Sequence, residues 1–364
     1  TVISAGNAGL TAAYHLSMHG CNVCLYGSPG FDEPLDDIEQ KGGIEAVSEL
    51  AELPMAFSGF ESIHTLSRDI AEAVAFADIL LLPVPSFAQD VLFDAMLPHI
   101  TDNHMIVLMP GNYGSLTLKK RMLTQGYDTL NPIFVDAISS PWACRINGPA
   151  QIAIMGLKEF LPVAVMPASK TDESVARLQE VLPLPLTSLS NVIAAGLENI
   201  NFGGHPLLTT LNMGLLENFE GDFNYYKDCC SPATARAAAV MEKERIAVGN
   251  ALGIELTPEL DAMNALYGTN SESVYEFNRS SETHGKITSA PDTSKHRYIT
   301  EDAPYLLVPC HGFGQLAKVP TPMIDACLTI DNAYNQTDYF QEGRTLEKMG
   351  LSGMTIEQVI AYVS

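Results

Sequence analysis

The first half of the chain alternates short apolar runs with amphipathic stretches. A short apolar run bounded by turn residues predicts a buried strand, and apolar residues spaced three and four apart predict a helix. On this basis we predict strands at residues 2–5, 22–26, 79–84, 105–109 and 133–135. Helices are predicted between them, at residues 10–19, 67–76, 87–97 and 115–123. Because alternating strands and helices form parallel sheets, we predict an α/β domain, whose sheet should be extended by apolar runs at 151–155 and 162–165.

The pattern changes after the proline-spaced segment Leu182-Pro183-Leu184-Pro185-Leu186, which is expected to act as a hinge. We therefore predict two domains, residues 1–186 and 187–364. The second is predicted to be all-α, with helices at residues 191–200, 206–219, 231–253, 258–267, 320–335 and 355–363. Residues 286–309 are less regular and are expected to be looped, while residues 31–60 show no clear period.

Composition narrows the class of protein. The chain has 364 residues, with 20 Lys and Arg against 43 Asp and Glu, and its formal net charge of −23 argues against nucleic-acid and anionic-membrane partners. Apolar residues make up 46% and charged residues 17%, which is enough apolar material for a buried core. No apolar run approaches the roughly 18 to 20 residues needed to cross a bilayer. Seven scattered cysteines and the lack of a recognisable leader lead us to expect a cytoplasmic protein, either a monomer or a homodimer.

A turn of small residues joins the first predicted strand to the first predicted helix. Dinucleotide-binding turns have three glycines here, for the tight turn, for the approach of the pyrophosphate and for close helix packing. Gly6 and Gly9 stand at the second and third positions, while Ser4 replaces the first. We therefore predict a Rossmann-like, doubly wound parallel sheet in a dinucleotide-binding domain, against the alternative of an ordinary strand–turn–helix. The pyrophosphate would be held by backbone N–H groups of Asn7, Ala8, Gly9 and Leu10.

The coenzyme cannot be chosen from the second predicted strand. Its end, Leu25-Tyr26-Gly27-Ser28, has neither the acid that usually binds the adenine ribose nor an arginine for a 2′-phosphate, although Ser28 could hydrogen-bond a phosphate. NAD and NADP both stay open, with a slight preference for NADP because the acid is absent. Pro83 and Pro85 close the third predicted strand, where they could hold a loop beside the nicotinamide or simply end the strand.

The candidate chemistry of the second domain lies in two segments. Two glycines interrupt a helical run before His205-Pro206, and the proline should start a new helix and bias His205 away from helical geometry. Such an imidazole could transfer protons near neutral pH, although a structural histidine is also compatible with the pattern. Further along, Arg297 could clamp a substrate carboxylate through its bidentate fork, and Asp302 could orient an imidazole. The alternative for that segment is an exposed charged loop.

No metal site is predicted. Cys21 and Cys24 have the spacing of half a zinc or redox site, but they fall within a predicted buried strand and no second pair matches them, so we interpret them as packing. The other histidines show no ligand spacing, and the vicinal pair Cys229-Cys230 has no assigned role.

Together these segments resemble the opine dehydrogenase family of the octopine/nopaline type, over about residues 2–363. The resemblance rests on the glycine turn, on Asn199-Ile200-Asn201 with His205-Pro206, and most specifically on Arg297-Tyr298-Ile299-Thr300-Glu301-Asp302-Ala303-Pro304. Pro141-Trp142-Ala143-Cys144-Arg145 also resembles a family segment.

The resemblance implies a reaction in which an amino acid condenses with a 2-oxo acid such as pyruvate, and NAD(P)H reduces the resulting imine. It implies that His205 donates and accepts the proton, that Asp302 holds the pKa of the imidazole up, and that Arg297 and Asn201 bind substrate. Two other functions stay open: a simple 2-oxo acid or ketone reductase of the dehydropantoate reductase or 6-phosphogluconate dehydrogenase build, and a nucleotide-sensing regulator. Such reductases usually have a catalytic lysine in the first helix of the second domain, and residues 191–206 contain none.

Overall fold

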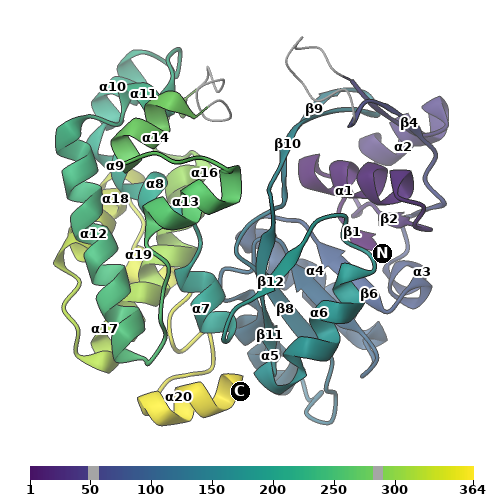
Figure 1. Ribbon diagram of the computed structural model, residues 1–364. Helices are drawn as coiled ribbons and strands as arrows, with labels where there is room; N and C mark the ends of the chain where they lie inside the picture. The colour runs from purple at the N-terminus through teal and green to yellow at the C-terminus, as the bar shows by residue number, and fades with distance from the viewer. Residues whose placement is uncertain (48–56, 282–289) are drawn as a thin grey trace. The chain divides into compact units, whose positions relative to one another are not determined.

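The computed structural model describes residues 1–47, 57–281 and 290–364. The chain divides into two compact units, Thr1–Val192 and Ile193–Ser364. The division falls slightly after the predicted boundary at residue 186, because β12 (Leu186–Ser188) pairs in parallel with β11 (Leu161–Met166) and so stays in the first unit. Figure 1 shows both units, with labels on many of their helices and strands.

The first unit is built on an eight-stranded sheet in the order β12-β11-β8-β7-β6-β1-β2-β5. The strands from β8 to β5 in this order are parallel: β1 (Val2–Ile3), β2 (Cys24–Tyr26), β5 (Thr65–Ser67), β6 (Ile79–Leu82), β7 (Met105–Leu108) and β8 (Ile133–Ala137). They are short and, apart from the edge strand β5, almost entirely buried, as continuous apolar runs in a covered parallel sheet should be. The sheet becomes mixed at one edge, where β11 runs antiparallel to β8.

Helices cross over between these strands: α1 (Asn7–Met18), α3 (Ile70–Phe76), α4 (Ser86–Met96), α5 (Gly114–Thr124) and α6 (Thr171–Gln179), with short 3-10 turns at Leu97–His99 and Ala168–Lys170. The chain passes from β1 outward through β2 to β5 and then returns to the other side of β1 as β6. The strand order therefore reverses at β1, and ligands of open α/β sheets bind at the carboxyl ends of the strands around such a reversal.

A second, four-stranded sheet corrects one prediction. Residues 151–155 were expected to extend the main sheet, but they lie in β10 (Gln151–Leu157), which pairs antiparallel with β9 (Trp142–Gly148). β10 also pairs in parallel with β3 (Ile44–Ala46), which pairs with β4 (Gly59–Glu61). Between β2 and β3 lies α2 (Glu33–Lys41), in a segment whose sequence showed no clear period.

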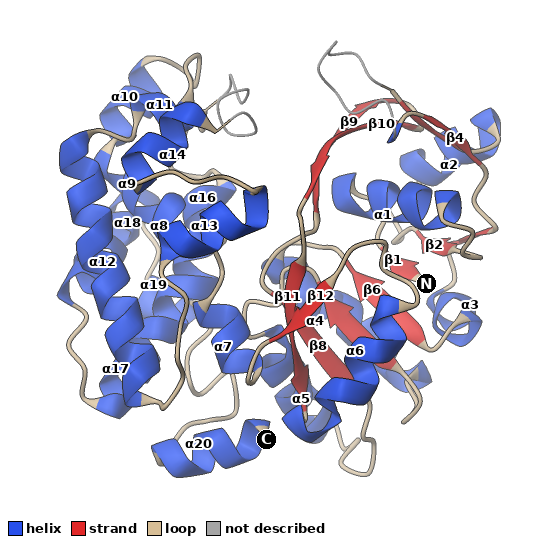
Figure 2. Ribbon diagram, viewed as in Figure 1, coloured by secondary structure: helices blue, strands red, loops and turns tan. Residues whose placement is uncertain are grey.

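The described part of the second unit contains helices and no strand (Figure 2). The helices are α7 (Val192–Leu197), α8 (Asn201–Gly204), α9 (Pro206–Leu211), α10 (Met213–Asn218), α11 (Tyr225–Asp228), α12 (Pro232–Ala251), α13 (Glu259–Tyr267), α14 (Val274–Ser280), α16 (Arg297–Thr300), α17 (Val308–Ala317), α18 (Pro322–Asn335), α19 (Tyr339–Glu342) and α20 (Ile356–Val363), with one π-helical turn, η4 (Ala303–Leu307). The longest, α12, begins with a capping box formed by Ser231 and Thr234. No described helix is both long and apolar enough to cross a membrane.

Two predictions for this unit were wrong. The segment 206–219 is not one helix, because the chain breaks at Asn212 (φ −118°, ψ 16°) between α9 and α10. The end of the segment 286–309 is not a loop, because α16, η4 and the start of α17 follow one another from Arg297. Ile299, Leu306 and Leu307 are fully buried, so the burial of these side chains stabilises helices that the local pattern did not show.

Candidate active site

The glycine turn after β1 has the close packing that a dinucleotide site requires. α1 begins at Asn7 with Gly6 as its N-cap, and both residues are exposed. A Cβ atom at Gly9 would lie 1.9 Å from the carbonyl oxygen of Ser4, so only glycine allows the helix to approach the strand this closely. The first turn of α1 carries no acidic side chain, and its exposed N–H groups are suited to an anion. The turn therefore fits the pyrophosphate of a dinucleotide.

Ser4 retains the backbone conformation of the glycine that it replaces. Its φ is 152°, in the region that favours glycine, and its Oγ accepts a hydrogen bond of 3.1 Å from the N–H of Gly6. The backbone of Ser4 thus adopts a conformation that glycine takes easily, although the residue is not glycine.

The predicted phosphate-binding groups are not equivalent. The side-chain amide of Asn7 donates to the carbonyl oxygen of Cys144 on β9 at 2.9 Å, which fixes the start of the helix. Ala8 is half-buried, whereas Leu10 lies in the core. The N–H of Leu10, expected to face a phosphate, instead donates to the carbonyl oxygen of Gly6 at 2.8 Å, so that part of the prediction was wrong.

Ser28, Pro83 and Pro85 lie on the same edge of the sheet as the turn. Ser28 follows the carboxyl end of β2 and is half-buried, and Pro83 follows β6 and is buried. Pro85 is the N-cap of α4, and the next residue, Ser86, accepts a hydrogen bond of 2.8 Å from the side-chain amide of Asn112, which follows β7. The loops after β1, β2 and β6 therefore flank the reversal point of the sheet.

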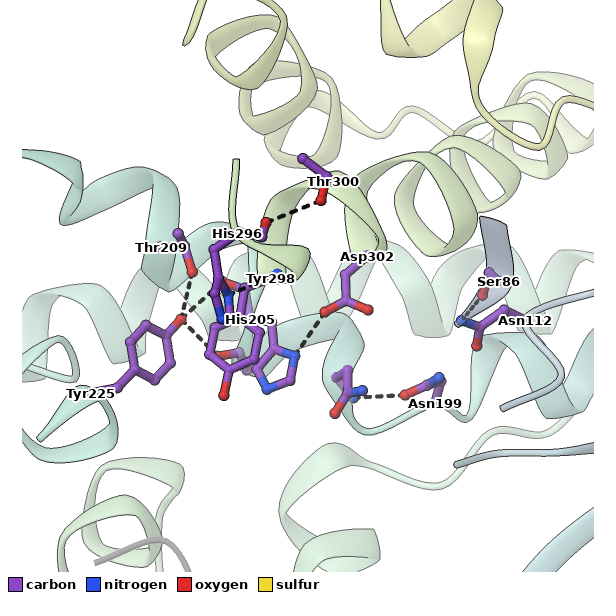
Figure 3. Close-up of polar contacts among 12 residues, drawn as sticks. Ser86, Asn112, Asn199, His205, Thr209, Tyr225, His296, Tyr298, Thr300 and Asp302 are labelled. Atoms are coloured by element: carbon purple, nitrogen blue, oxygen red, sulfur yellow. Dashed lines mark hydrogen bonds and ion pairs between the residues drawn. The ribbon is translucent and has the colours of Figure 1, made fainter. Parts of the chain in front are cut away.

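In the second unit, the structure brings His205 and Asp302 together although 97 residues separate them. His205 Nδ1 lies 2.7 Å from Asp302 Oδ2, and the two side chains are only 7% and 5% exposed (Figure 3). His205 joins α8 to α9, and Asp302 lies between α16 and η4. Such a pair fixes the imidazole in orientation and tautomer.

His205 has helical backbone geometry (φ −111°, ψ −66°), so the expectation that Pro206 would bias His205 away from this geometry was wrong. The N–H of His205 donates to the carbonyl oxygen of Asn201 at 3.1 Å, and the carbonyl oxygen of His205 accepts from Thr209 at 3.0 Å. These two backbone hydrogen bonds hold His205 in helical geometry, against the preference of a residue before proline for an extended conformation.

Two tyrosines that sequence reasoning missed complete the surroundings of the imidazole. The hydroxyl of Tyr226 on α11 lies 3.1 Å from His205 Nε2. The ring of Tyr298 on α16 stacks on the imidazole, with the ring centres 3.6 Å apart and an interplanar angle of 12°. Tyr298 was within the segment identified from its charged residues, whereas nothing in the local sequence marks Tyr226.

Burial dominates the electrostatics of this pair. Burial, and to a smaller extent the charge of Arg297, lower the pKa of His205 to about 3, against the effect of Glu301. Burial also raises the pKa of Asp302 well above its usual value, against the effect of Arg297. The expectation that Asp302 holds the imidazole pKa up is therefore wrong for this state. With the imidazole neutral, Nδ1 shares a proton with Asp302, and Nε2 faces the hydroxyl of Tyr226.

Arg297 is exposed at the start of α16, and no described residue forms a hydrogen bond or ion pair with its guanidinium. It nevertheless lies close enough to lower the pKa values of both His205 and Asp302. Asn201 begins α8, is half-buried, and donates its backbone N–H to Asn199 Oδ1 at 2.9 Å. Arg297 is thus a cation that could bind an anionic ligand near the buried pair His205–Asp302.

The cysteines are free thiols in the structure. Burial raises the pKa of Cys24 to about 11 and that of Cys229 to about 12, which makes both unreactive near neutral pH. Within residues 1–47, 57–281 and 290–364, no group of three or more His, Cys, Asp or Glu side chains could hold a metal ion.

An open α/β sheet with a dinucleotide-type turn at its reversal point, followed by a separate helical domain, is the architecture of an NAD(P)-dependent dehydrogenase. Residues 188–335 match the family described as NAD/NADP octopine/nopaline dehydrogenase, alpha-helical domain. An opine dehydrogenase of Arthrobacter sp. (strain 1C) is 30% identical over 355 residues, covering 97% of this chain and 95% of the relative.

Solved structures of octopine dehydrogenase show the same fold. The structure with NADH and L-arginine has a TM-score of 0.79 at 19% identity, and the structure with NADH and pyruvate has a TM-score of 0.76 at 19% identity. In both comparisons 99% of this chain and 96% of the other are covered.

The chain therefore belongs to the opine dehydrogenase family, as its sequence motifs indicated. As a member it is an oxidoreductase that acts on the CH–NH group of its donors with NAD or NADP. The predicted fold, a Rossmann-like domain followed by a helical domain, is confirmed.

Proposed function

We propose that this protein condenses the amine of an amino acid with a 2-oxo acid of the pyruvate type and reduces the imine to a secondary amine. In this proposal the first unit binds the coenzyme and the second carries the catalytic residues. His205 is the proton donor and acceptor, Asp302 its partner, and Arg297 with Asn201 the binding residues for substrate. L-Arginine and pyruvate are bound in the octopine dehydrogenase structures, which supports these two substrate classes.

The observation that carries the proposal is the hydrogen bond of 2.7 Å between His205 and Asp302, buried beside an exposed arginine. A solvated structural histidine needs neither a buried carboxylate nor an adjacent cation. Their combination supports proton transfer at a fixed imidazole close to an anionic substrate.

Because burial lowers its pKa, His205 is neutral near pH 7 and is therefore set to accept a proton first. Since Nδ1 faces Asp302, Nε2 is the atom that exchanges protons. As the amine nitrogen adds to the carbonyl carbon, neutral Nε2 takes a proton from that nitrogen. The imidazolium that forms is paired with Asp302, and it returns the proton to the carbonyl oxygen, which becomes a hydroxyl. Nε2 then takes a second proton from solvent and gives it to this hydroxyl, which leaves as water while the nitrogen keeps its remaining hydrogen in the protonated C=N bond. When bound, NAD(P)H supplies the hydride that reduces this bond.

Arg297 would hold the substrate carboxylate through two parallel N–H···O bonds, since a guanidinium matches a carboxylate in this way. An arriving carboxylate would also neutralise a charge that lowers the pKa of His205. Binding of an acidic substrate would therefore raise the pKa of the imidazole and favour the protonated form when it is needed.

The experiment is oxidation of NADH or NADPH in the presence of pyruvate, with and without a mixture of amino acids. Turnover that requires both substrates supports the proposal. Turnover with pyruvate alone would instead identify a simple 2-oxo acid reductase. Coenzyme binding without turnover in a screen of amino acids against pyruvate and 2-oxoglutarate would identify a nucleotide-sensing protein.

A further inference from the structure

Arg68 is held by three carboxylates, those of Asp36 and Glu39 on α2 and that of Asp32, the N-cap residue of α2. Its Nη2 lies 2.5 Å from Asp36 Oδ1, its Nη1 lies 2.7 Å from Glu39 Oε1, and its Nε lies 3.5 Å from Asp32 Oδ1. Every nitrogen of the guanidinium therefore has an acidic partner. All four side chains are at least one third exposed, so they could rearrange around a ligand, and they form a network instead of a single ion pair.

This cluster lies at the strand ends where a dinucleotide presents its adenosine ribose. Arg68 directly follows β5, which is the neighbour of β2 in the sheet. Tyr26 at the end of β2 pairs with Ser67, and the N–H of Gly27 donates to the carbonyl oxygen of Ser67 at 3.0 Å. Arg68 thus stands beside the segment after β2 that distinguishes a ribose 2′-hydroxyl from a 2′-phosphate in this fold.

The charge of the cluster decides whether it favours a ribose 2′-hydroxyl or a 2′-phosphate. A phosphate monoester carries a charge of about −1.5 to −2 at neutral pH and needs a cation with unoccupied donors. Arg68 is the only Lys or Arg on β5 and its flanking turn, and its donors are engaged by acids that exceed its own charge. Glu33 and Asp37 add two further acids on α2. A neutral ribose hydroxyl meets no such repulsion.

We propose that the acidic residues of α2 and its N-cap set the coenzyme preference of this enzyme toward NAD(H), by occupying Arg68 and by repelling a 2′-phosphate. This inference rests on the proposed function, since it requires the coenzyme at the carboxyl ends of β1 and β2. It opposes the slight preference for NADP from the sequence, which rested on the missing acid after β2. The acids that matter come instead from α2, and the arginine comes from the neighbouring strand.

The test is equilibrium binding of NADH and NADPH to the full chain, followed by the fluorescence of the reduced nicotinamide. The wild type should bind NADH at least about tenfold more tightly than NADPH. Asp36→Asn/Glu39→Gln, which releases Arg68, should lower the Kd for NADPH about tenfold and leave that for NADH within about twofold. Adding Arg68→Gln to this variant should remove the gain.

Glu33→Gln/Asp37→Asn is the matched control, because it removes the same charge from the same helix and leaves the contacts of Arg68 intact. The control should gain clearly less than the variant that releases Arg68, because Glu33 and Asp37 contribute repulsion but do not hold Arg68. An equal gain in NADPH affinity in this control, or equal affinities of the wild type for the two coenzymes, would overturn the inference and leave the proposed function standing. Failure of the wild type to bind either coenzyme would overturn both.

Discussion

The indole N–H of Trp142 on β9 donates a hydrogen bond of 2.9 Å to Nδ1 of His15 on α1. The two side chains are buried, and this bond joins the second sheet to the helix that begins at the glycine turn. Burial, and to a smaller extent the charge of His19, lower the pKa of His15 to about 4. The neutral imidazole can accept this bond only while Nδ1 is unprotonated. Trp142 is the only tryptophan of the chain, so its fluorescence reports on this contact.

Acid should therefore destabilise the first unit through His15. A histidine whose folded pKa is depressed contributes stability at high pH, and this is lost as the pH falls from about 6.5 through about 4. We expect a loss of about 3 kcal/mol in the free energy of unfolding over this range, because the pKa of His15 falls from 6.5 to about 4 on folding. Denaturant titrations followed by Trp142 fluorescence at pH 7 and pH 4 measure it. His15→Gln should flatten this pH dependence, whereas His99→Gln, at an exposed site, should keep it. The same slope in His15→Gln and wild type would contradict the assignment.

Removal of the imidazole of His205 should abolish most of the turnover. We expect His205→Ala to lower kcat about 100-fold or more, because a positioned acid–base typically contributes that much, and to leave NADH affinity unchanged. Asp302→Asn should also lower kcat, because a neutral amide does not stabilise the imidazolium that forms during proton transfer.

A second histidine–aspartate pair provides the control for this prediction. His311 Nδ1 lies 2.6 Å from Asp325 Oδ1 in the same unit. His311→Ala removes an equivalent contact and should leave kcat within about twofold. Steady-state kinetics and circular dichroism of the variants test the prediction, and a His205→Ala variant with unchanged kcat would remove His205 from the mechanism.

The charge and the geometry of Arg297 can be tested separately. Arg297→Gln should raise the pKa of His205, since the guanidinium charge lowers it, and histidine NMR titration of the substrate-free protein measures this change. Arg297→Lys keeps the charge and should leave that pKa lowered, but it loses the bidentate fork. Its KM for the 2-oxo acid should therefore rise about tenfold or more, with a smaller change in coenzyme affinity. Arg236→Gln, at an exposed site on α12, is the control. Equal losses of coenzyme and substrate affinity in Arg297→Lys would indicate a structural arginine.

Glu259 should make the second unit less stable as the pH rises. Burial and then the charge of Glu242 raise the pKa of Glu259 to about 7, against the effect of Arg245. The carboxylate packs against α8, since a Cβ at Gly203 would lie 2.5 Å from Glu259 Oε2. An acid with a raised folded pKa stabilises the fold fully below its unfolded value of about 4.5, and this stability is lost as the pH rises through about 7.

Glu259→Gln should therefore be more stable relative to wild type at pH 8 than at pH 4.5, by about 3 kcal/mol. Chemical unfolding at the two pH values measures this difference. Glu255→Gln, four residues earlier and exposed, should show no such change with pH. If Glu259→Gln had the same pH dependence as wild type, ionisation of Glu259 would not be linked to folding.

Local patterns in the sequence predicted what local forces determine. The strands predicted at residues 79–84 and 105–109 were found as β6 and β7. A continuous apolar run between turn residues is typical of a strand in a sheet that is covered on both faces. Gly9 was identified because no other residue permits the approach of α1 to Ser4. The helices from Arg297 to Ala317 were missed, since their stability comes from burial against other elements and not from a visible local period.

The sequence by itself determined the order of the elements, the glycine turn and the kinds of chemical group available, because these depend on neighbours a few residues apart. Only the tertiary structure decided which groups meet: His205 with Asp302 and Tyr226, and Arg68 with the acids of α2. Such encounters join segments tens of residues apart, and they depend on how every intervening element packs. The same packing removes water from His205, which is why its pKa is set by burial more than by the carboxylate beside it.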